Sequence, residues 1–280
     1  MKKNYKLVNV AILIPTCNEE IHINRCLSQL KVFPSVYILD TDSTDKTIDL
    51  IKSYNVNLIQ HEKKFRSFAQ KLNYGLNFLY DNYDWVFIIH ADELITSSIK
   101  DLIKKLKENK YKSYSAISVK RKLSFLGKVM NYGGNTTDQL RFFKAKCAFY
   151  KDSEIDEKVE LYGKNLKTSC EIIDYPLNNY SVWIDKHSVY SINQARKSKK
   201  LGFKNPNIGF IQNLYEKSPL FLRCMILFLF KYLICLGFLD GKSGLAYCVS
   251  HNLIYRLMVD VRLLTGDTKY QNNIKHKILE

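Results

Sequence analysis

The sequence has no CxxC cysteine pair, no cleavable export signal and only one long apolar run. Its seven cysteines are scattered and odd in number, which argues against a disulfide framework or a zinc site. The basic start at residues 1–6 leads into a short apolar stretch without a small-residue cleavage site, so we expect a cytoplasmic protein. The apolar run, residues 220–239, contains Arg223 and Lys231 and is too interrupted to predict a transmembrane span.

Acidic residues are also few, with 27 Asp and Glu against 43 Lys and Arg and a net charge of +16. Such a surface favours phosphate-rich partners, which include nucleic acid, nucleotides and anionic lipid. The sequence has 19 tyrosines, but no RNA or DNA motif places aromatic residues among basic ones. We therefore expect no nucleic-acid partner and keep a basic nucleic-acid-binding protein as an alternative.

Short apolar strands alternate with helix-like segments and predict an α/β domain. Residues 10–14 and 36–39 are apolar runs, each followed by polar residues and then by apolar positions at helical spacing. Residues 67–80 also have helical periodicity, whereas strand patterns dominate further along. We expect a mixed, mainly parallel sheet flanked by helices over residues 1–190, and a basic helical region over 191–280.

Three polar clusters follow predicted strands, at residues 15–20, 40–45 and 90–93. Ligands of such sheets bind beyond the carboxyl ends of the strands, so we expect the clusters to line one crevice. Asp92 is suited to hold a divalent cation that bridges phosphates. Helix capping is the alternative for Asp92 and Glu93.

The cluster at 40–45 places three carboxylates within six residues, an arrangement that suits hydrogen bonds to a ribose or a base. A turn built from good turn-forming residues is the alternative. We expect Ser43 or Thr44 to be the N-cap of the following helix.

Together these clusters resemble the motifs of the family 2 glycosyltransferases, which have the Rossmann-like GT-A fold. The resemblance is carried by IPTCNEE at 14–20, LDTDSTDKT at 39–47 and IHADE at 89–93, which agree in order, spacing and strand context. It implies an enzyme that takes a sugar from a nucleotide-diphosphate donor, with Mg²⁺ or Mn²⁺ as cofactor. Asp92 would be the direct metal ligand.

By the same resemblance, one set of side chains contacts the nucleotide sugar, and Asp40 within it holds the uracil or ribose. The members on the segment FRSFAQKLN, residues 65–73, would otherwise be ordinary surface-helix residues. The whole set is Pro15, Thr16, Asn18, Glu19, Asp40, Asp42, Arg66, Gln70, Asn73, Ala91 and Glu93.

His90 stands where the family normally has the first Asp of its Asp-x-Asp metal motif. Three roles are open for it: a second metal ligand, a hydrogen-bonding partner of the ribose, or a tolerated replacement. As a ligand, a neutral imidazole would shift preference from Mg²⁺ toward Mn²⁺ or a softer ion.

An inverting transfer needs a base that takes the proton of the acceptor hydroxyl. The segment DSEIDEKVE at 152–160 resembles the part of the family that supplies it, so Glu157 is the expected catalytic base, with Asp156 second. A solvated acidic loop is the alternative.

The second half resembles bacterial lipopolysaccharide inner-core β-glucosyltransferases, through residues 185–195 and 237–244. The resemblance implies transfer of a hexose, with UDP-glucose as expected donor, to a glycan or glycolipid such as the lipopolysaccharide core. A capsule or exopolysaccharide acceptor and a non-catalytic binding module are the alternatives. Basic and apolar residues around 220–239 predict peripheral contact with an anionic membrane, whose inner face is the expected location; a core helix with snorkelling cations is the alternative.

Overall fold

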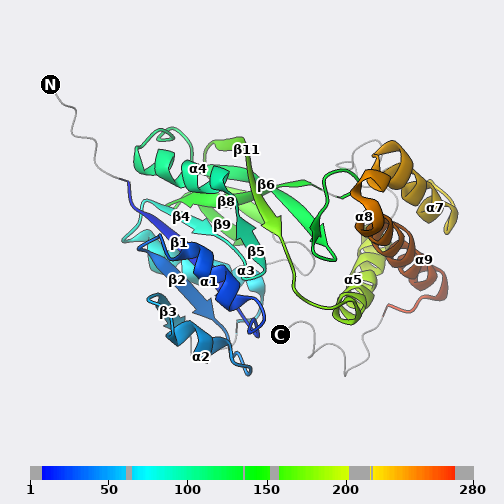
Figure 1. The fold of residues 1–280 in the computed structure, drawn as a ribbon, viewed down its shortest axis with the longest axis horizontal. Coiled ribbons are helices and arrows are strands. Elements are labelled where there is room, and N and C mark those ends of the chain that lie inside the picture. The colour runs from blue at the N-terminus through cyan, green and yellow to red at the C-terminus, as the bar shows by residue number, and fades with distance from the viewer. Residues whose placement is uncertain are drawn as a thin grey trace. The chain divides into compact units, whose positions relative to one another are not determined.

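The computed structural model describes residues 8–60, 65–134, 136–151, 158–201, 215 and 217–268 (Figure 1). The chain forms two compact units. The first comprises the chain up to Leu123 together with Thr136–Leu177, and the second comprises Ser124–Asn135 and the chain from Asn178 onward. In this part of the chain the division falls after Leu177, whereas we expected it after residue 190.

The first unit is built on a sheet whose spatial order is β3-β2-β1-β4-β8-β6-β11-β5, with β7 paired to β6 and a separate β9–β10 hairpin. The strands are β1 (Val10–Thr16), β2 (Val36–Asp40), β3 (Asn57–Gln60), β4 (Trp85–Ile88), β5 (Glu93–Ile95), β6 (Ala116–Phe125), β7 (Lys128–Val129), β8 (Thr137–Lys144), β9 (Ala148–Lys151), β10 (Lys158–Leu161) and β11 (Asn165–Asp174).

Parallel pairing aligns the strand ends that carry the polar clusters. β1 runs parallel to both β2 and β4, with Thr16 opposite Asp40 in the register. β8 then runs antiparallel to β4 and β6, which makes the sheet mixed, as predicted. The clusters after β1, β2 and β4 therefore emerge at one edge of the parallel part.

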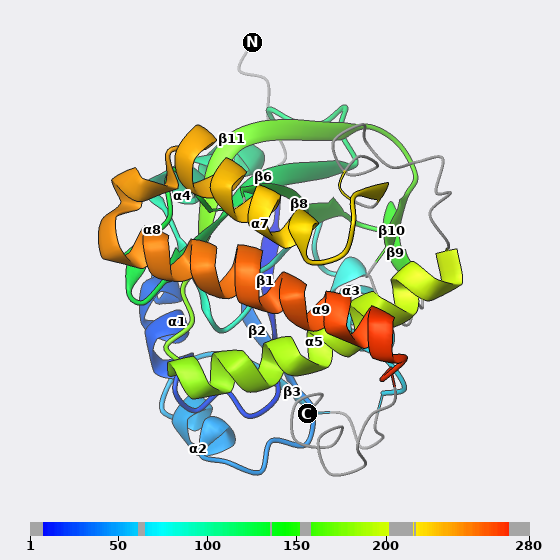
Figure 2. The same cartoon turned by 90° about the vertical axis from the view of Figure 1, so that its right-hand side faces the viewer.

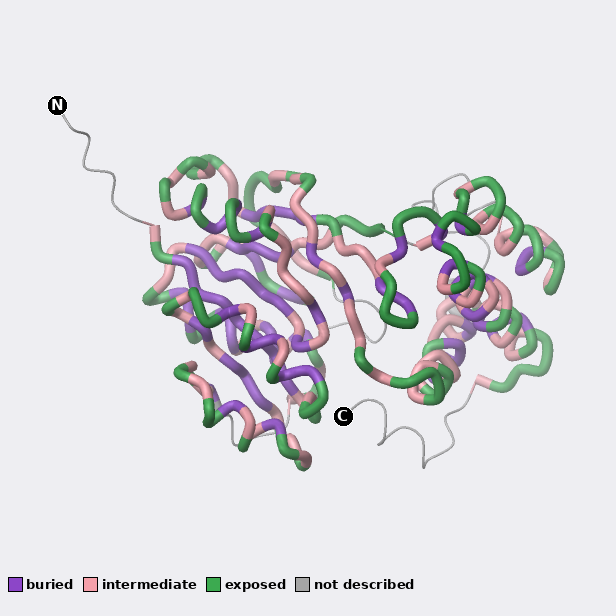
Figure 3. The backbone as a smooth tube through the Cα atoms, in the orientation of Figure 1, coloured by how far each residue is buried: buried purple, intermediate pink, exposed green. Residues whose placement is uncertain are grey.

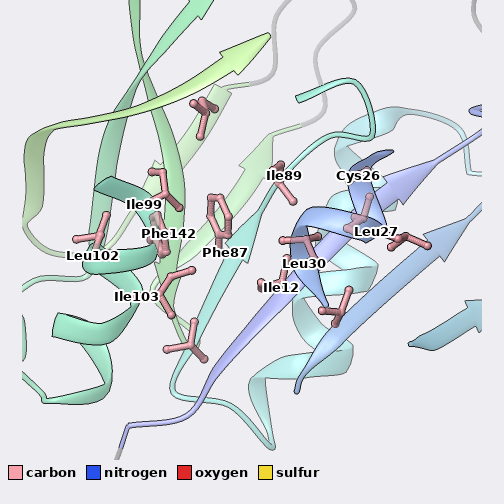
Figure 4. Packing of buried hydrophobic residues seen from close by; sticks show 14 of the residues in the cluster. Ile12, Cys26, Leu27, Leu30, Phe87, Ile89, Ile99, Leu102, Ile103 and Phe142 are labelled. Carbon is pink, nitrogen blue, oxygen red and sulfur yellow. The ribbon is translucent and has the colours of Figure 1, made fainter. Parts of the chain in front are cut away.

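Helices cover both faces of this sheet, as the alternation of side chains along β1 requires. Ile12 and Ile14 pack in one cluster with α1 and α4, part of which Figure 4 shows, whereas Ala11 and Leu13 pack with α3 on the opposite face. The helices of this unit are α1 (Ile23–Leu30), α2 (Thr47–Lys52), α3 (Phe68–Tyr80) and α4 (Ser97–Lys107).

Helix α3 approaches β1 closely at Gly75. A Cβ atom built on Gly75 would lie 2.7 Å from a methyl group of Leu13, so a larger residue there requires that the side chain of Leu13 or the helix shifts. Ser67 caps α3, because its side chain accepts the N–H of Gln70 at 3.2 Å. The cap and the close packing fix the first turn of α3, which faces the polar clusters.

The second unit is helical apart from the β6–β7 turn, as predicted for the C-terminal region (Figure 2). Helices α5 and α9 pack together, and Ala195, Tyr255 and Val259 form a buried cluster between them. The elements are α5 (Tyr180–Leu201), α7 (Leu222–Leu229), the π-helical η1 (Phe230–Ile234), the 3₁₀ turn η2 (Gly237–Asp240), α8 (Gly241–Tyr247), the π-helical η3 (Cys248–Ile254) and α9 (Tyr255–Thr265).

Within the described ranges no single helix has the length and apolarity to cross a bilayer, although the bent pair Leu222–Ile234 and Gly237–Thr265 meets that test when taken together. The bend of 70° occurs at Cys235 and Leu236, where Leu236 has a left-handed backbone with φ of 58°.

The buried carboxylate of Asp240 organises one loop of the second unit. It accepts the backbone N–H groups of Asn131, Tyr132 and Gly133 at 3.0–3.2 Å. A Cβ atom on Gly133 would lie 2.8 Å from the Cα atom of Gly237, so the two loops need glycine where they touch. Asp240 thus joins η2 to the glycine-bearing loop after β7.

Replacing Asp240 with alanine should lower the free energy of unfolding by about 2–3 kcal/mol, because three backbone N–H groups, of which that of Gly133 is buried, lose their acceptor. Urea denaturation would measure the change. Asp267→Ala is the control, since Asp267 forms an exposed ion pair with Arg262 whose loss should cost below about 1 kcal/mol. Equal losses for the two variants would contradict the role given to Asp240.

Candidate functional site

The ends of β1 and β2 are joined through the carboxylate of Asp40. The hydroxyl groups of Thr16 and Ser43 both donate to Oδ2, at 2.8 and 2.6 Å, and the N–H of Ser43 donates to Oδ1. Asp40 is almost fully buried, so this carboxylate holds the two strand ends in a fixed relation. Its contact with a uracil or ribose stays a prediction.

Asn18 makes the second link between the loops after β1 and β2. Its backbone is left-handed, with φ of 54°, and its side-chain oxygen accepts the N–H of Thr44 at 2.8 Å. Ser43 and Thr44 therefore form hydrogen bonds within and between these loops. Neither is the N-cap of α2, which begins at Thr47. The predicted N-cap was wrong because these hydroxyls bond to Asp40 and Asn18 instead.

Glu19 is held by His22 on the first turn of the segment that leads into α1. Nε2 of His22 accepts the N–H of Leu177 at 3.0 Å, so the proton of the neutral ring resides on Nδ1 and is donated to Glu19 at 2.6 Å. The N–H of Glu19 also donates to Thr47. These contacts hold the Glu19 carboxylate beside the loops that follow β1 and β2.

Lys71 introduces a buried cation beside this pair of loops. Its ammonium group donates to the carbonyl of Thr16 at 2.7 Å and to the hydroxyl of Thr41 at 2.6 Å. Burial lowers the pKa of Lys71, while nearby acidic groups, among them Asp40 and Glu19, oppose the shift. The lysine therefore places a positive charge at the ends of β1 and β2.

The loop after β4 holds Asp92 by its backbone and leaves its side chain available. The carbonyl of Asp92 accepts the guanidinium of Arg25 at 3.1 Å and the N–H of Tyr175 at 2.9 Å. Its carboxylate makes no hydrogen bond or ion pair with any residue that the structure describes. A carboxylate fixed in place without an internal partner is suited to bind a ligand from outside.

Two residues away, the ring of His90 is held by Arg141 of β8. Nη1 of Arg141 donates to Nε2 of His90 at 3.2 Å, which leaves the proton on Nδ1. Desolvation and then the Arg141 charge lower the pKa of His90 to about 3, so the ring is neutral at physiological pH. Since Nε2 is occupied in this arrangement, a metal contact of His90 stays a prediction.

Glu93 is fully buried, and its carboxylate serves the loop itself. It forms an ion pair with Arg141, lies 3.5 Å from Nε of Arg121, and accepts the N–H of His90 at 2.9 Å. These contacts lock the turn that presents Asp92. They give Glu93 a structural role beside the substrate contact that we predicted, which stays a prediction.

A third carboxylate, Asp174 at the end of β11, completes this group. It pairs with Arg121, yet burial raises its pKa to about 7, and the neighbouring charges of Asp92 and Glu93 act in the same direction. Carboxylates are thus crowded around Asp92. The same crowding favours the arrival of a divalent cation.

The predicted residues of α3 and the preceding loop serve mainly to hold that part of the fold. The side-chain oxygen of Gln70 accepts the N–H of Arg66 at 3.1 Å, and Arg66 is exposed. Asn73 bonds both backbone groups of Tyr150 at 2.7 and 2.8 Å and so attaches β9 to α3. The ring of Phe68 lies against His90, with 5.9 Å between centroids, so α3 does border the loop of Asp92.

The remaining predicted residues divide by position. Pro15 and Ala91 are buried, and Asp42 is exposed with a left-handed backbone at φ of 52°. Glu157 and Asp156, the predicted base and its alternative, lie outside the described residues.

Four cations that no motif revealed surround the predicted acidic residues: Arg25, Lys71, Arg121 and Arg141. Each sits inside a helix or strand, and their partners lie between 28 and 150 positions away in the sequence. The only local signal is a charged residue at an inward-facing position of an apolar element, as at Lys71 on α3.

The family model that describes glycosyl transferase family 2 matches residues 11–158, which is more than half of the chain. The chain belongs to this family. The matched region begins in β1 and ends in β10, so it contains all three polar clusters and the loop of Asp92. The predicted GT-A-type mixed α/β fold and the predicted glycosyltransferase class are both confirmed.

Among curated proteins, glycosyltransferase SunS of Bacillus phage SPbeta and its counterpart from the SPbeta prophage of Bacillus subtilis are similar over 92 residues, at 32% identity. The similar region covers 32% of this chain and 21% of each relative, so the chain matches about a fifth of their length.

Two solved structures are also similar. Staphylococcus aureus TarS, residues 1–349, has a TM-score of 0.43 at 12% identity over 94% of this chain and 93% of that one. Glucosyl-3-phosphoglycerate synthase of Mycobacterium tuberculosis, bound to Mn²⁺, UDP and its product, has a TM-score of 0.35 at 16% identity over 41% and 44%.

The residues at this site fit a divalent cation that is completed by its substrate. Mg²⁺ in enzymes commonly uses one or two carboxylates together with phosphate oxygens and water. Asp92 offers such a carboxylate, and the described residues contain no group of three or more ligands that would enclose a metal by itself. Asp92 is therefore the described residue that would hold such a cation if one is bound together with a diphosphate.

Proposed function

We propose that this family 2 glycosyltransferase moves a hexose, with inversion, from UDP-glucose to a lipid-linked surface glycan such as the lipopolysaccharide inner core. The observation that carries the donor class is the carboxylate of Asp92, which is held in place through its backbone, makes no hydrogen bond with a described residue, and interacts electrostatically with Arg25 and Arg121. A diphosphate needs both kinds of group, because its charge is shared between fixed cations and a metal.

In the proposed reaction the acceptor oxygen attacks the anomeric carbon on the side opposite the diphosphate. The bond from that carbon to the phosphate oxygen breaks, and the electron pair leaves with the nucleotide. The acceptor proton passes to a carboxylate, for which Glu157 is the candidate. A bound Mg²⁺ or Mn²⁺ supplies charge neutralisation of the departing diphosphate.

The cations of the chain assist at fixed places. Lys71 holds the carbonyl of Thr16 at the end of β1, and Arg25 holds the carbonyl of Asp92. Because these groups are already in position, they need no rearrangement as negative charge develops on the leaving group. The neutral ring of His90 adds no charge where the family normally has an Asp.

The proposal of glucose and of a lipid-linked acceptor rests on the segments 185–195 and 237–244. Part of this resemblance has a structural basis, because Gly237 and Asp240 build the contact with the glycine-bearing loop. Those residues therefore support membership of the same subgroup more strongly than they support the sugar. A panel of UDP- and GDP-sugars, each offered with lipopolysaccharide core and with capsular acceptors, would decide donor and acceptor.

Removal of divalent metal should abolish both the sugar transfer and the slow hydrolysis of the donor. EDTA is expected to lower the rate at least about a hundredfold and to weaken UDP binding measured by calorimetry, with recovery on addition of Mn²⁺ or Mg²⁺. Donor hydrolysis provides a readout that requires no knowledge of the acceptor. Turnover that is unchanged in EDTA would contradict metal dependence and would assign the neutralisation to Arg25, Lys71, Arg121 and Arg141.

A non-catalytic binding module is the second candidate, and the His90–Arg141 contact at the usual Asp position is the observation that favours it. The two candidates differ in the same assay. A catalyst releases UDP from its donor in a metal-dependent manner, whereas a binding module retains UDP-sugar intact in calorimetry without turnover.

A further inference from the structure

The second unit exposes a large apolar surface that the transfer reaction does not use. Between Phe221 and Leu264, sixteen large apolar side chains are exposed, and the backbone of α7 and η1 is largely exposed in Figure 3. Monomeric proteins rarely leave so many apolar side chains together in water, and such surfaces normally mark a site of interaction. A core helix with snorkelling cations, one alternative for this segment, does not describe these side chains.

The exposed side chains follow helical spacing along α7 and η1. Leu222, Ile226, Leu229 and Leu233 recur every three or four residues and so share one side of the continuous helix. The opposite side is attached to the rest of the unit through Arg223, whose guanidinium pairs with Asp260. The helix is therefore amphipathic, but its apolar side is exposed and does not pack in a core.

Helix α9 adds a second outward stripe. Ile254, Leu257, Val261 and Leu264 are exposed at the same spacing, with Leu264 66% exposed. Asp260, between Leu257 and Leu264 in sequence, is buried and directed toward Arg223 and the N–H of Phe221 on the α7 side. The buried ion pair thus holds α7 beside α9, and both present their apolar stripes to the outside.

The exposed charged side chains of this surface are mainly basic. Residues 217–268 contain six Lys and Arg and three carboxylates; Asp240 and Asp260 are buried and internally bonded, and Asp267 is exposed but paired with Arg262. Lys217 and Lys242 are exposed as well, so the exposed lysines outnumber the one exposed carboxylate of this stretch. An anionic surface attracts the lysines, and it would have repelled exposed carboxylates.

We infer that the surface formed by α7, η1 and α9 docks on an anionic lipid bilayer and lies in its interface. The eight residues of α7 and five of η1 give about 20 Å of helix, short of the roughly 30 Å of a hydrocarbon core, and the chain bends at Leu236. Both features suit a helix that lies in the interface rather than one that spans it.

A second copy of the chain fits this surface less well. A two-fold dimer applies the same patch of each subunit to the other, so Lys217 and Lys242 would approach a surface whose one exposed carboxylate, Asp267, is already paired with Arg262. Lipid headgroups supply the missing negative charge around an apolar interior. The bilayer is therefore the occupant that satisfies both the apolar and the basic parts of the surface.

Co-sedimentation of the purified chain with vesicles tests this inference. Vesicles of phosphatidylglycerol and phosphatidylcholine should retain the protein, while pure phosphatidylcholine or raised salt should weaken retention. Ile234→Glu and Leu264→Glu, at sites 71% and 66% exposed, should each lower the partition coefficient at least about tenfold without lowering the melting temperature. Val32→Glu, at a 73% exposed apolar site of the first unit, is the matched control and should bind as the parent does.

Three results would overturn the inference: a parent protein that stays in the supernatant with anionic vesicles at low salt, glutamate variants that bind as the parent does, or a dimer that these variants dissociate while vesicles retain nothing. Since the assay contains no sugar donor, its outcome is independent of the proposed transfer reaction. If the parent protein does not bind vesicles but still hydrolyses the donor, the docking surface is rejected and the proposed transfer reaction is not.

Discussion

Replacing Asp92 with asparagine should lower the rate of donor hydrolysis and sugar transfer at least about a thousandfold. The carboxylate of Asp92 has no described internal partner, so the substitution removes the proposed metal ligand and no structural bond. The backbone carbonyl of Asp92, which Arg25 and Tyr175 bind, is unchanged in this variant. The free energy of unfolding should therefore stay within about 0.5 kcal/mol of the parent value.

Steady-state kinetics with saturating Mn²⁺ and calorimetry of Mn²⁺ with UDP would measure both parts of this prediction. Asp101→Asn is the matched control, because Asp101 is an exposed carboxylate on α4 and should affect neither rate nor metal binding. A variant at Asp92 that is as active as this control would remove the metal from the mechanism. A variant that unfolds would instead show that the carboxylate has a structural partner.

The parallel part of the fold could be predicted because its strands have local signals. Each of β1, β2 and β4 is a short apolar run that ends in polar residues, and the register then requires that their ends meet at one edge. The helix of residues 67–80 was likewise visible in its spacing, and Ser67 caps it. The N-cap of the helix after β2 was not predicted correctly, because the hydroxyl of Ser43 bonds back to Asp40 and that of Thr44 bonds to Asn18 in another loop.

The site was predictable only in its acidic half. Asp40 and Asp92 belong to continuous motifs, so the sequence shows both the residues and their place after a strand. Arg121 and Arg141 reach Glu93 from strands that lie 28 and 48 residues away. Such pairs depend on the order of strands in the sheet, which no local pattern contains.

The position of His90 gains a physical explanation from Arg141. An aspartate there would lie next to Glu93 and near Asp174, in a group where burial, together with the charges of Asp92 and Glu93, already raises the pKa of Asp174 to about 7. A neutral ring that accepts a hydrogen bond from Arg141 avoids a further negative charge. It leaves Asp92 as the carboxylate that faces a ligand, which fits a site with one protein ligand to the metal.

Replacing Glu93 with glutamine should lower the free energy of unfolding by about 3–5 kcal/mol, a larger effect than any substitution at Asp92. Glu93 is 0% exposed and pairs with Arg141, which is itself almost fully buried. Removal of its charge leaves a buried guanidinium without its counterion, and this is the costly way to disrupt a buried pair. Urea denaturation would measure the change, with Glu171→Gln as control because the pair of Glu171 with Lys122 is partly exposed.

The double variant Glu93→Gln, Arg141→Met separates the ion pair from a substrate contact of Glu93. If the cost arises from the orphaned cation, the double variant should recover at least about 1 kcal/mol relative to Glu93→Gln alone. If Glu93 instead contacts the donor sugar, Glu93→Gln should keep the stability of the parent and raise the KM for the nucleotide sugar. The two outcomes exclude each other. The first requires that the carboxylate of Glu93 be engaged in its ion pair with Arg141, and the second requires that it be accessible to the donor.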